Sequence, residues 1–426
     1  MSNFSPPPGT SDIFPEEISL WHRLEDVARR VFPLYGYREM RTPVFEYTEV
    51  FRRGIGDETE VVQKEMYTFE DRGGRSLTLR PEGTAGIMRS LSGTDVMNGN
   101  EKRVYYIGPM FRGERPAAGR RRQFHQIGAE NAGRVSPELD AESIALLLHY
   151  LDELGITGYR LLLNTRASGE DRKPAEDSLR AYFANHVPGM CPDCKNRLER
   201  NVWRILDCKQ EQCRVFIEKV PDIAGLLGEP SRKYFEKVCS SLSAMNIPFE
   251  VDSRLVRGLD YYVHTVFEVT HPGLGAQNAI AGGGRYEIFA PESRKPIVGV
   301  GFAAGLERLL MAQEALSVKA PQPENSPAVF LIGLGENAIS ENMKLASRLR
   351  KAGISAITEV EQKSMKASMR AANRIAAKFA VIRGDNEISR GTLVLKNMSD
   401  GAQSEIGSEP QSLMDCLKKA EAIAKD

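Results

Sequence analysis

Residues 111–130, FRGERPAAGRRRQFHQIGAE, predict the central part of the fold, because two strand-like segments flank a basic loop. The stretch holds five arginines and only two carboxylates, whereas the whole chain balances 57 Lys and Arg against 57 Asp and Glu. A chain without net charge is not a general polycation. Positive charge concentrated in one short stretch therefore indicates a local site for an anion.

The side chains of this hairpin sort onto two faces, because successive residues of a strand point in opposite directions. We expect strands at 104–115 and 123–130, with PAAGRRR as the loop between them. The second strand then presents Phe124, Gln126, Gly128 and Glu130 on one face, and the first presents Met110, Arg112 and Glu114. If the faces coincide, Arg112, Gln126 and Glu130 form a polar floor, while the tip carries Arg115, Arg120, Arg121 and Arg122.

Three interpretations of these arginines remain open at this point. An arginine on the sheet suits a phosphate, because its planar guanidinium pairs bidentately with oxyanions. Arginines on a loop suit a polyanion such as a nucleic-acid backbone. The purely structural alternative is a solvated edge hairpin whose charges deter aggregation.

Two segments place polar groups where a strand or a helix begins. LTLRPEGTAG, residues 77–86, puts Glu82 and Thr84 at a helix start, and Thr84 is the expected cap of a short helix from Ala85. VRGLDYYVHTVFEV, residues 256–269, puts Arg257 and Asp260 just before a β-rich alternation. Both segments can supply charged groups to a shared site.

Two glycine-rich segments complete the pattern. VGVGFAAGLERLL, residues 298–310, runs from a strand into a helix, and Arg308 in the first turns opposes the helix dipole unless an anion binds there. AIAGGGRYE, residues 279–287, has no Lys-Ser or Lys-Thr after it, which excludes a P-loop. Its glycines instead suit close approach of a ligand to the backbone.

Composition and length limit the class of protein. At 426 residues with 41% hydrophobic content, two or three globular domains are expected. The chain has no apolar run long enough for a membrane span, and MSNFSPPPGTSDIFPEE lacks the features of a secretory signal. Six cysteines are too few for a disulfide scaffold, so we expect a cytoplasmic protein in a reducing compartment.

The motifs together resemble the histidyl-tRNA synthetases, a family of class II aminoacyl-tRNA synthetases, in their bacterial form. REMRTPVFE, with Pro43, is similar to the first class motif, FRGERP through QFHQIGAE to the second, and GVGFAAGLERLL to the third. RGLDYY and AGGGRY resemble the two signatures that distinguish the histidine-specific members. The resemblance runs from PPPGTSDIFP to the C-terminus.

The resemblance implies an α+β fold in which helices flank an antiparallel sheet of six to seven strands. We expect a catalytic domain in two parts, 1–167 and 251–318, around a polar helical insertion at 168–250. A linker at 319–327 then leads to an α/β anticodon-binding domain at 328–426. An obligate homodimer, with the first motif at its interface, is also implied.

The implied reaction is the ATP-dependent formation of histidyl-adenylate, followed by transfer of the histidyl group to tRNA(His). Mg²⁺ accompanies the ATP, and Arg257 resembles an arginine that stabilises the α-phosphate where other class II enzymes use a metal. Arg112 and Arg257 are the expected catalytic residues, and Arg112, Glu114 and Arg308 the expected ATP ligands. The implied histidine-binding set is Glu82, Gly83, Thr84, Arg112, Gln126, Glu130, Arg257, Tyr261 and Tyr262. Within it Glu82, Thr84 and Gln126 are expected to hold the α-amino group, and Glu130 and Tyr262 to bind the imidazole.

Expected tRNA contacts fall in two places. Arg120, Arg121 and Arg122 would face the acceptor end. In the C-terminal domain Lys363, Lys366, Arg370 and Arg374 form one face of an expected helix at 363–377, with no acid from Gln362 to Gly384. A basic face of this kind is either solvated or close to RNA, and both interpretations remain open.

Five of the six cysteines lie in the helical insertion. Cys191 and Cys194 form a CxxC pair, and Cys208 and Cys213 form a looser CxxxxC pair. Free structural thiols are the favoured interpretation, because the resemblance does not require zinc. A four-thiolate zinc site is the alternative.

Three rival functions remain. A histidine-biosynthesis regulatory subunit shares the catalytic fold, but such subunits usually lack the C-terminal domain that this chain has. A class II synthetase for glycine, proline or threonine is disfavoured by RGLDYY and by Glu130. A pure RNA-binding module would leave the expected phosphate-binding arginines unexplained.

Overall fold

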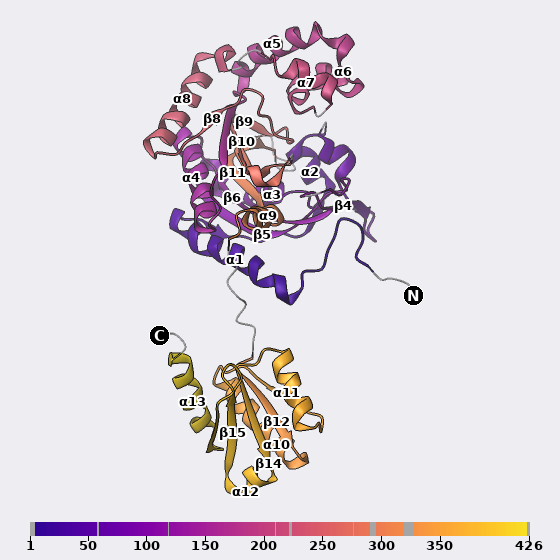
Figure 1. The fold of residues 1–426 in the computed structure, drawn as a ribbon. Helices are drawn as coiled ribbons and strands as arrows, with labels where there is room; N and C mark the ends of the chain where they lie inside the picture. The colour runs from indigo at the N-terminus through magenta and orange to yellow at the C-terminus, as the bar shows by residue number, and fades with distance from the viewer. Residues whose placement is uncertain are drawn as a thin grey trace. The chain divides into compact units, whose positions relative to one another are not determined.

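The computed structural model describes residues 5–57, 59–117, 119–208, 210–220, 224–275, 277–289, 295–318 and 327–423. The chain divides into two compact units, Met1–Pro321 and Gln322–Asp426 (Figure 1). Most of the expected linker, residues 319–326, lies outside the described residues. No described helix combines the length and apolar character that crossing a membrane requires.

An eight-stranded sheet forms the centre of the first unit, with strand order β1-β5-β6-β11-β10-β9-β7-β8. In that order the strands are Arg38–Glu39, Lys102–Phe111, Gln123–Ala132, Ile297–Gly305, Ala279–Ile288, Tyr262–Thr270, Arg160–Thr165 and Glu250–Val251. The six inner strands pair antiparallel, as expected. The expectation of six to seven strands was wrong, because two-residue strands pair in parallel with each outer edge.

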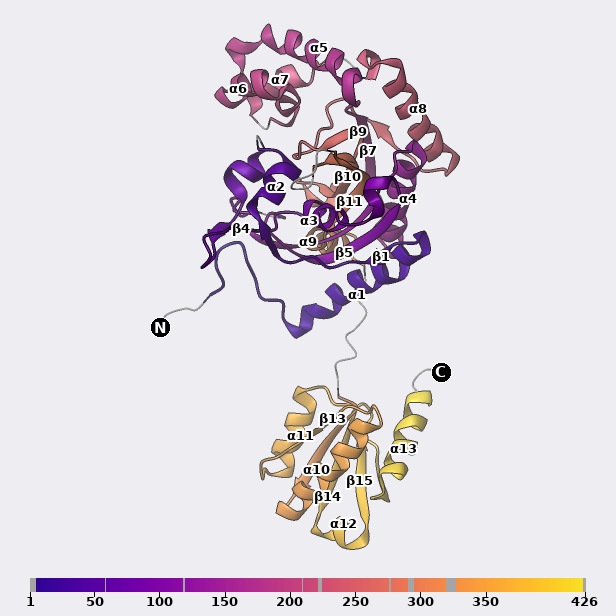
Figure 2. The same cartoon turned by 180° about the vertical axis from the view of Figure 1, so that it is seen from behind.

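One face of this sheet is covered by four helices that bury their apolar stripes against it (Figures 1 and 2). They are α1 (Pro15–Val31), α4 (Pro137–Glu153), α8 (Glu229–Ala244) and α9 (Leu306–Ala315). In α1 the apolar residues Leu24, Val27 and Val31 recur at helical spacing and are buried. This face is therefore closed by a hydrophobic core and leaves the opposite face for a site.

The opposite face carries smaller elements. Helix α3 (Thr84–Leu91) packs there, with α2 (Thr48–Ile55) against it. Strands β2 (Phe45–Tyr47), β4 (Ser76–Leu79) and β3 (Thr68–Glu70) form a separate antiparallel sheet beside them. Gly73 and Gly74 lie in the turn that joins β3 to β4.

The insertion between β7 and β8 is helical, as expected. It contains α5 (Lys173–Ala184), α6 (Pro192–Arg200), the 3-10 helix η6 (Val202–Asp207), α7 (Glu211–Ile217) and α8. Apart from α8, these elements surround a small hydrophobic core of their own, which includes Leu179, Phe183 and Trp203.

The second unit is a five-stranded sheet of order β13-β12-β14-β15-β16. The strands are Ala356–Thr358, Val329–Leu334, Phe379–Gly384, Thr392–Asn397 and Gln403–Gly407, and the helices are α10 (Glu336–Lys351), α11 (Met365–Arg374), α12 (Asp385–Arg390) and α13 (Pro410–Ile423). Alternate residues of β12 face opposite cores, one under α10 and α13 and the other under α11. The sequence pattern missed two elements, α12 and β16.

Candidate active site

Two adjoining cavities open on the face of the large sheet that carries α3. The larger has a volume of about 220 Å³ and the smaller about 50 Å³. Both are lined by Arg112, Gln126, Arg257, Gly282 and Ala303. The shared lining makes them two compartments of one site.

Alternation along β6 and β5 places polar groups in this site. On β6, Ile127 and Ala129 point into the helix-covered core, whereas Gln126 and Glu130 line the cavities. Gly128 lies between those two polar residues and pairs with Tyr106 of β5. A Cβ atom at Gly128 would lie 2.4 Å from the Tyr106 ring, so the glycine makes room for the aromatic floor of the site.

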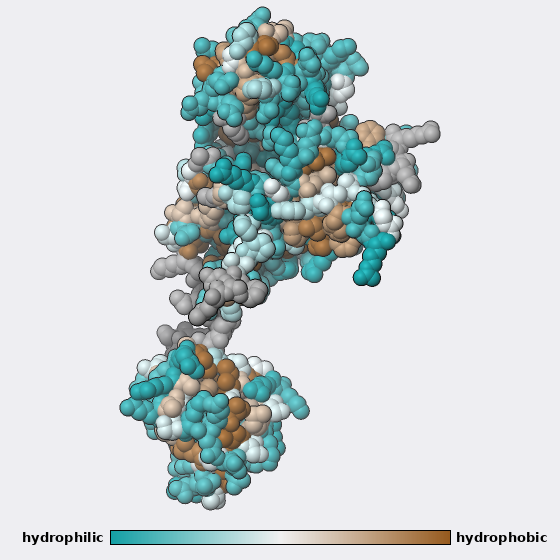
Figure 3. Space-filling model, turned by 90° about the vertical axis from the view of Figure 1, so that its right-hand side faces the viewer, coloured by the Kyte–Doolittle hydropathy of each residue, from teal (hydrophilic) through white to brown (hydrophobic). Residues whose placement is uncertain are grey.

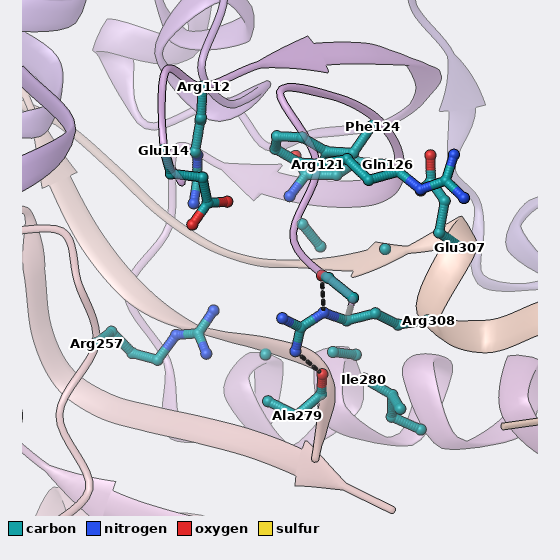
Figure 4. A pocket seen from close by; sticks show the side chains of 15 residues that line it. Arg112, Glu114, Arg121, Phe124, Gln126, Arg257, Ala279, Ile280, Glu307 and Arg308 are labelled. Carbon is teal, nitrogen blue, oxygen red and sulfur yellow. Dashed lines mark hydrogen bonds between the residues drawn. The ribbon is translucent and has the colours of Figure 1, made fainter. Parts of the chain in front are cut away.

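Three arginines from distant parts of the chain converge on the larger cavity. Figure 4 shows the guanidinium groups of Arg112, Arg257 and Arg308 reaching into the same space from different sides. Carbonyl and carboxylate groups hold each of them on one side only. Three positive charges at one cavity are suited to a phosphate chain.

The anchoring contacts explain how each arginine is fixed. Arg112 donates from Nε to the carbonyl oxygen of Pro81 at 2.9 Å. Arg257 donates from Nη1 to Oε2 of Glu268 at 2.7 Å. Both guanidinium groups also line the larger cavity, where they can meet a ligand.

Arg308 is fixed in the same way by backbone oxygens. It donates from Nε to the Gly119 carbonyl at 3.0 Å and from Nη1 to the Ala279 carbonyl at 2.6 Å (Figure 4). Burial lowers the pKa of Arg308, and the neighbouring charge of Arg120 lowers it further. A bound anion would stabilise the charged form of this half-buried arginine.

The start of α3 differs from the sequence expectation. Thr84 does not cap the helix, because its hydroxyl donates to Oε1 of Glu130 at 2.7 Å. The carboxylate of Glu82 instead accepts from the backbone N–H groups of Thr84 and Ala85, each at 2.7 Å. A two-oxygen carboxylate can satisfy two amides at once, and it complements the positive end of the helix dipole.

Glu130 is a buried acid of the smaller cavity, and its pKa is raised. Its side chain is 1% exposed, and burial raises its pKa to about 8, although hydrogen bonds from Thr84 and Tyr286 oppose the shift. A Cβ atom at Gly301 would lie 1.9 Å from Oε2 of Glu130, so only glycine leaves space for this carboxyl group. The carboxyl is therefore predominantly neutral at pH 7 in the ligand-free site.

Three buried polar atoms at the junction of the two cavities make no hydrogen bond within the described part of the chain. They are Oε1 of Gln126, Oε2 of Glu130 and Nε of Arg257. Leaving such atoms unpaired costs roughly 1–3 kcal/mol each. A polar ligand in the cavities would satisfy them.

Most of the expected histidine-binding residues come together here. Glu82, Thr84, Arg112, Gln126, Glu130, Arg257, Tyr261 and Tyr262 all line the smaller cavity. Gly83 is not among the lining residues. It precedes α3 and packs beside Tyr106, whose ring would lie 2.3 Å from a Cβ atom at that position.

Sequence reasoning missed Tyr106 and Tyr286 in the lining and Glu268 as the anchor of Arg257. The pairing of Gly128 with Tyr106 and of Gly299 with Tyr286 carried a signal, because a glycine opposite a large ring marks close packing. Arg285 of AGGGRY has a structural role, since it pairs with Asp140 in the core at 1% exposure.

The expected ATP and tRNA residues of the hairpin lie close to the larger cavity. Glu114 and Arg121 line it. The three loop arginines are half-buried rather than freely exposed. Arg120 donates to Gln277, Arg121 to Ser11, and Arg122 to the backbone oxygen of Glu114.

The other two expected groups are placed as follows. Cys191, Cys194, Cys208 and Cys213 come together in the insertion, with their sulfur atoms within 4.8 Å of one another. In the second unit Lys366, Arg370 and Arg374 are exposed on α11. Lys363 precedes that helix and pairs with Glu359 and Glu361, so it does not belong to the helical face.

The chain is similar to known proteins over most of its length. The family model "Histidyl-tRNA synthetase" matches residues 9–167 and 220–309, and the model "Anticodon binding domain" matches residues 328–419. A histidine–tRNA ligase of Halothermothrix orenii is 46% identical, covering 94% of this chain and 96% of its own. A histidine–tRNA ligase from a Geobacillus species is 45% identical, covering 98% of this chain and 99% of its own.

Solved structures give the same result. Apo histidyl-tRNA synthetase of S. aureus matches with a TM-score of 0.79 and 34% identity, covering 98% of this chain and 99% of that one. Histidyl-tRNA synthetase from Nostoc matches with a TM-score of 0.66 at 22% identity, covering 99% and 100%, which supports the fold.

Proposed function

The chain belongs to the histidyl-tRNA synthetase family and attaches L-histidine to tRNA(His) through histidyl-adenylate, releasing AMP and diphosphate, and we propose that the two joined cavities are where the adenylate forms. The larger cavity binds ATP and the smaller binds histidine. The observation that carries this assignment is the convergence of Arg112, Arg257 and Arg308 beside a slot with unpaired buried polar atoms.

Adenylate formation needs an in-line attack of the histidine carboxylate on the α-phosphate of ATP. The protein forms no covalent bond to the substrates in this step, so its catalytic effect comes mainly from positioning the substrates and neutralising their charge. Arg112 and Arg257 lie where both cavities meet, and they neutralise the α-phosphate and the approaching carboxylate. Of these two cavities Arg308 lines the larger and not the smaller, and it binds the γ-phosphate end.

Mg²⁺ would accompany the ATP. Hard divalent cations prefer oxygen ligands, so the carboxylates lining the ATP cavity are the relevant groups. Glu307 accepts the backbone N–H of His125 and is engaged in that contact. Glu114 is the carboxylate that would hold the ion, which supplies further positive charge to the phosphates.

The smaller cavity selects histidine by pairing polar atoms. Glu82, Thr84 and Gln126 are assigned to the α-amino group, and Glu130 with Tyr262 to the imidazole nitrogens. A substrate without these nitrogens leaves buried groups unpaired, which can discriminate by roughly 10⁴–10⁵ in the best cases. This selectivity would make a separate editing site unnecessary.

A regulatory subunit that lacks synthetase activity is the second candidate. An ATP phosphoribosyltransferase regulatory subunit/histidyl-tRNA synthetase from Bacillus halodurans matches at 21% identity and a TM-score of 0.62, so it shares the fold alone. The anticodon-binding unit and the three cavity arginines favour the enzyme.

The direct test is Arg257→Ala in histidine-dependent exchange of pyrophosphate into ATP. We expect the exchange rate to fall at least a hundredfold, because a half-buried positive charge at the reacting centre is lost. Arg254→Ala is the matched control, since Arg254 lies three residues earlier and pairs with Asp252 at the surface. Equal rates in the two variants would reject the role of Arg257, and exchange with another amino acid would reject the specificity.

We propose that two copies pair through the three-stranded sheet of the first motif. Its exposed apolar side chains are Val44, Phe45, Tyr47, Tyr67 and Phe69. Figure 3 views the side on which Figure 1 draws β4, and apolar side chains gather in patches there. Exposed apolar patches of this kind mark interfaces.

Light scattering at micromolar concentration tests the dimer. Phe69→Asp places a charge in the patch, and we expect it to convert the dimer into a monomer. Leu34→Asp is the control, because Leu34 is 70% exposed on the 3-10 helix Phe32–Tyr35 and should leave the mass unchanged. A monomeric wild-type chain would contradict the proposal.

The tRNA is proposed to contact the protein in two places, with its acceptor end at the hairpin loop and with another part at α11. Arg121 lines the ATP cavity, where the acceptor end must enter for transfer, and Arg120 and Arg122 are its neighbours in the same loop. Lys366, Arg370 and Arg374 form the exposed basic face of α11. Lys363 lies before the helix and outside that face, and it is proposed as a neighbouring contact. The cytoplasm, where tRNA is charged, is the proposed location.

A further inference from the structure

The cysteine cluster of the insertion has no part in the chemistry described above. Cys191 and Cys194 lie at the start of α6, Cys208 directly follows η6, and Cys213 lies in α7. All four side chains are buried, at 8% exposure or less. The family model leaves out residues 168–219, which contain the cluster.

The spacing of the sulfur atoms matches a tetrahedral metal centre. All four lie within 4.8 Å of one another, and Sγ of Cys191 lies 3.8 Å from Sγ of Cys208. Four sulfurs at about 2.3 Å from a zinc ion lie about 3.8 Å apart. A disulfide would need about 2.05 Å, so these atoms are placed as separate ligands.

Backbone amides favour the thiolate form at this cluster. The N–H of Cys194 donates to Sγ of Cys191 at 3.4 Å, and the N–H of Cys191 donates to Sγ of Cys213 at 3.3 Å. Cys191 is also the N-cap of α6, where the helix dipole stabilises negative charge. Hydrogen bonds from backbone N–H groups to ligand atoms are typical of metal centres.

We propose that Cys191, Cys194, Cys208 and Cys213 bind one zinc ion as a closed, structural four-thiolate site. Binding replaces four thiol protons by one Zn²⁺, so four protons are released and the centre carries a net charge of minus two. An all-sulfur ligand set excludes Mg²⁺ and Ca²⁺, which need oxygen. Four protein ligands leave no open position, so the ion is not catalytic.

A metal also explains how this part of the insertion holds its shape. Its hydrophobic core is small, and small folded units of this kind depend on an additional cross-link such as a metal ion. The two ligand pairs bracket residues 195–207. A zinc ion would therefore fix both ends of this segment, which contains most of α6 and all of η6.

This bracketed segment touches the loop that carries Arg257. Arg204 of η6 donates from Nη2 to the carbonyl of Gly258 at 2.8 Å and from Nε to Asp260 at 3.2 Å. Asn201 donates to the same carboxylate at 2.9 Å. The zinc site thus positions the loop from Gly258 to Asp260, and this positioning role rests on the proposed function of Arg257.

The first experiment measures metal in the full-length chain, purified under reducing conditions without chelator. We expect about one zinc per chain by mass spectrometry, and strong visible absorption from tetrahedral thiolate coordination after replacement by Co²⁺. Titration with an organomercurial should release zinc in step with modification of four thiols. No zinc, no zinc uptake, an iron–sulfur spectrum, or a disulfide in the native chain would each overturn the proposal.

Variants locate the site. Cys194→Ser and Cys213→Ser should lose zinc, whereas Cys239→Ser should retain it, because Cys239 lies on α8 of the same insertion but outside the cluster. If the cluster variants do not fold, the thiol-linked zinc release of the wild-type chain decides the question. Retention of full zinc by Cys194→Ser would overturn the ligand assignment.

The positioning role has its own readout in hydrogen–deuterium exchange. After zinc removal we expect peptides covering 201–207 and 257–262 to exchange at least tenfold faster, while peptides of the second unit do not change. Unchanged protection of 257–262 in a zinc-free chain would reject the coupling to the loop. Zinc content does not depend on catalysis, so failure of the proposed function would leave the metal site untouched.

Discussion

Among single residues, Glu130 illustrates how the fold sets the chemistry of a side chain. Its pKa is raised from 4.5 to about 8 by burial in the smaller cavity. The glycine at position 301 and the hydroxyl of Thr84 leave one carboxyl oxygen without a partner. A carboxyl group that is neutral near pH 7 can either donate to or accept from an imidazole nitrogen, which suits a histidine slot.

This raised pKa predicts a pH dependence of stability. Between pH 4.5 and 8 the folded state keeps a proton on Glu130 that the unfolded state releases, so the contribution of Glu130 falls as pH rises. The stabilising contribution of Glu130 is fully present below pH 4.5 and is lost above pH 8. Between these values it falls by about 1.4 kcal/mol per pH unit.

Denaturant unfolding of the wild type and Glu130→Gln at several pH values measures this contribution. We expect the difference in free energy of unfolding between the two proteins to decrease from pH 5 to pH 8, because glutamine does not titrate. Other titrating groups cancel in the difference. A constant difference across this range would mean that Glu130 ionises normally in the folded protein.

At the scale of secondary structure, the pair of Arg285 and Asp140 joins β10 to α4 through the core. The guanidinium donates to Oδ1 of Asp140 at 2.7 Å, and Thr265 donates to the other oxygen at 2.6 Å. Both charged side chains are at most 1% exposed. The pair therefore fixes the sheet against the helix from within.

Asp140→Asn should destabilise the protein by about 3–5 kcal/mol, because a buried guanidinium loses its counter-charge. Glu250→Gln is the control, since the pair of Arg160 and Glu250 is more than half exposed and should contribute no more than about 1 kcal/mol. Urea unfolding measures both changes. A loss below about 1 kcal/mol in Asp140→Asn would show that the core tolerates the lone arginine.

Elements with a regular pattern were predictable from the sequence. The alternation of Gln126 and Glu130 with buried Ile127 and Ala129 gave the hairpin and its polar face. The buried apolar residues of α1 recur at helical spacing, which is as regular a pattern. In both cases the pattern is long enough to distinguish a period of two from a period of 3.6.

Short elements and long-range contacts were not predictable. Strands β1 and β8 have two residues each, so pairing partners rather than side-chain pattern define them. Thr84 was expected to cap α3. Its hydroxyl instead donates to Glu130, because that buried carboxyl needs a hydrogen-bond partner, and Glu82 accepts the N–H groups at the start of the helix. The meeting of four cysteines depends on how three short helices pack, which their spacing alone does not determine.

For the whole molecule, the two units predict a division of labour. The cavities with their arginines belong to the first unit, and the basic face of α11 belongs to the second. Adenylate formation requires only histidine and ATP, so it should depend on the first unit alone. Charging of tRNA should depend on both.

Replacing Lys366, Arg370 and Arg374 by alanine tests this division. Each lost cation removes a contact to backbone phosphate, so we expect the KM for tRNA to rise roughly tenfold or more and the salt dependence of binding to weaken. The exchange of pyrophosphate into ATP should keep its rate.

The matched control replaces Lys344, Arg348 and Lys351 of α10, which removes the same charge from another exposed face of this unit. If the α10 variant raises the KM for tRNA as much as the α11 variant, the effect is general electrostatics and α11 is not the tRNA-binding face. If the α11 variant slows the exchange reaction instead, the two units do not divide the reaction as proposed. A rise in KM confined to the α11 variant would assign that helix to the tRNA, because only the position of the three charges distinguishes the two proteins.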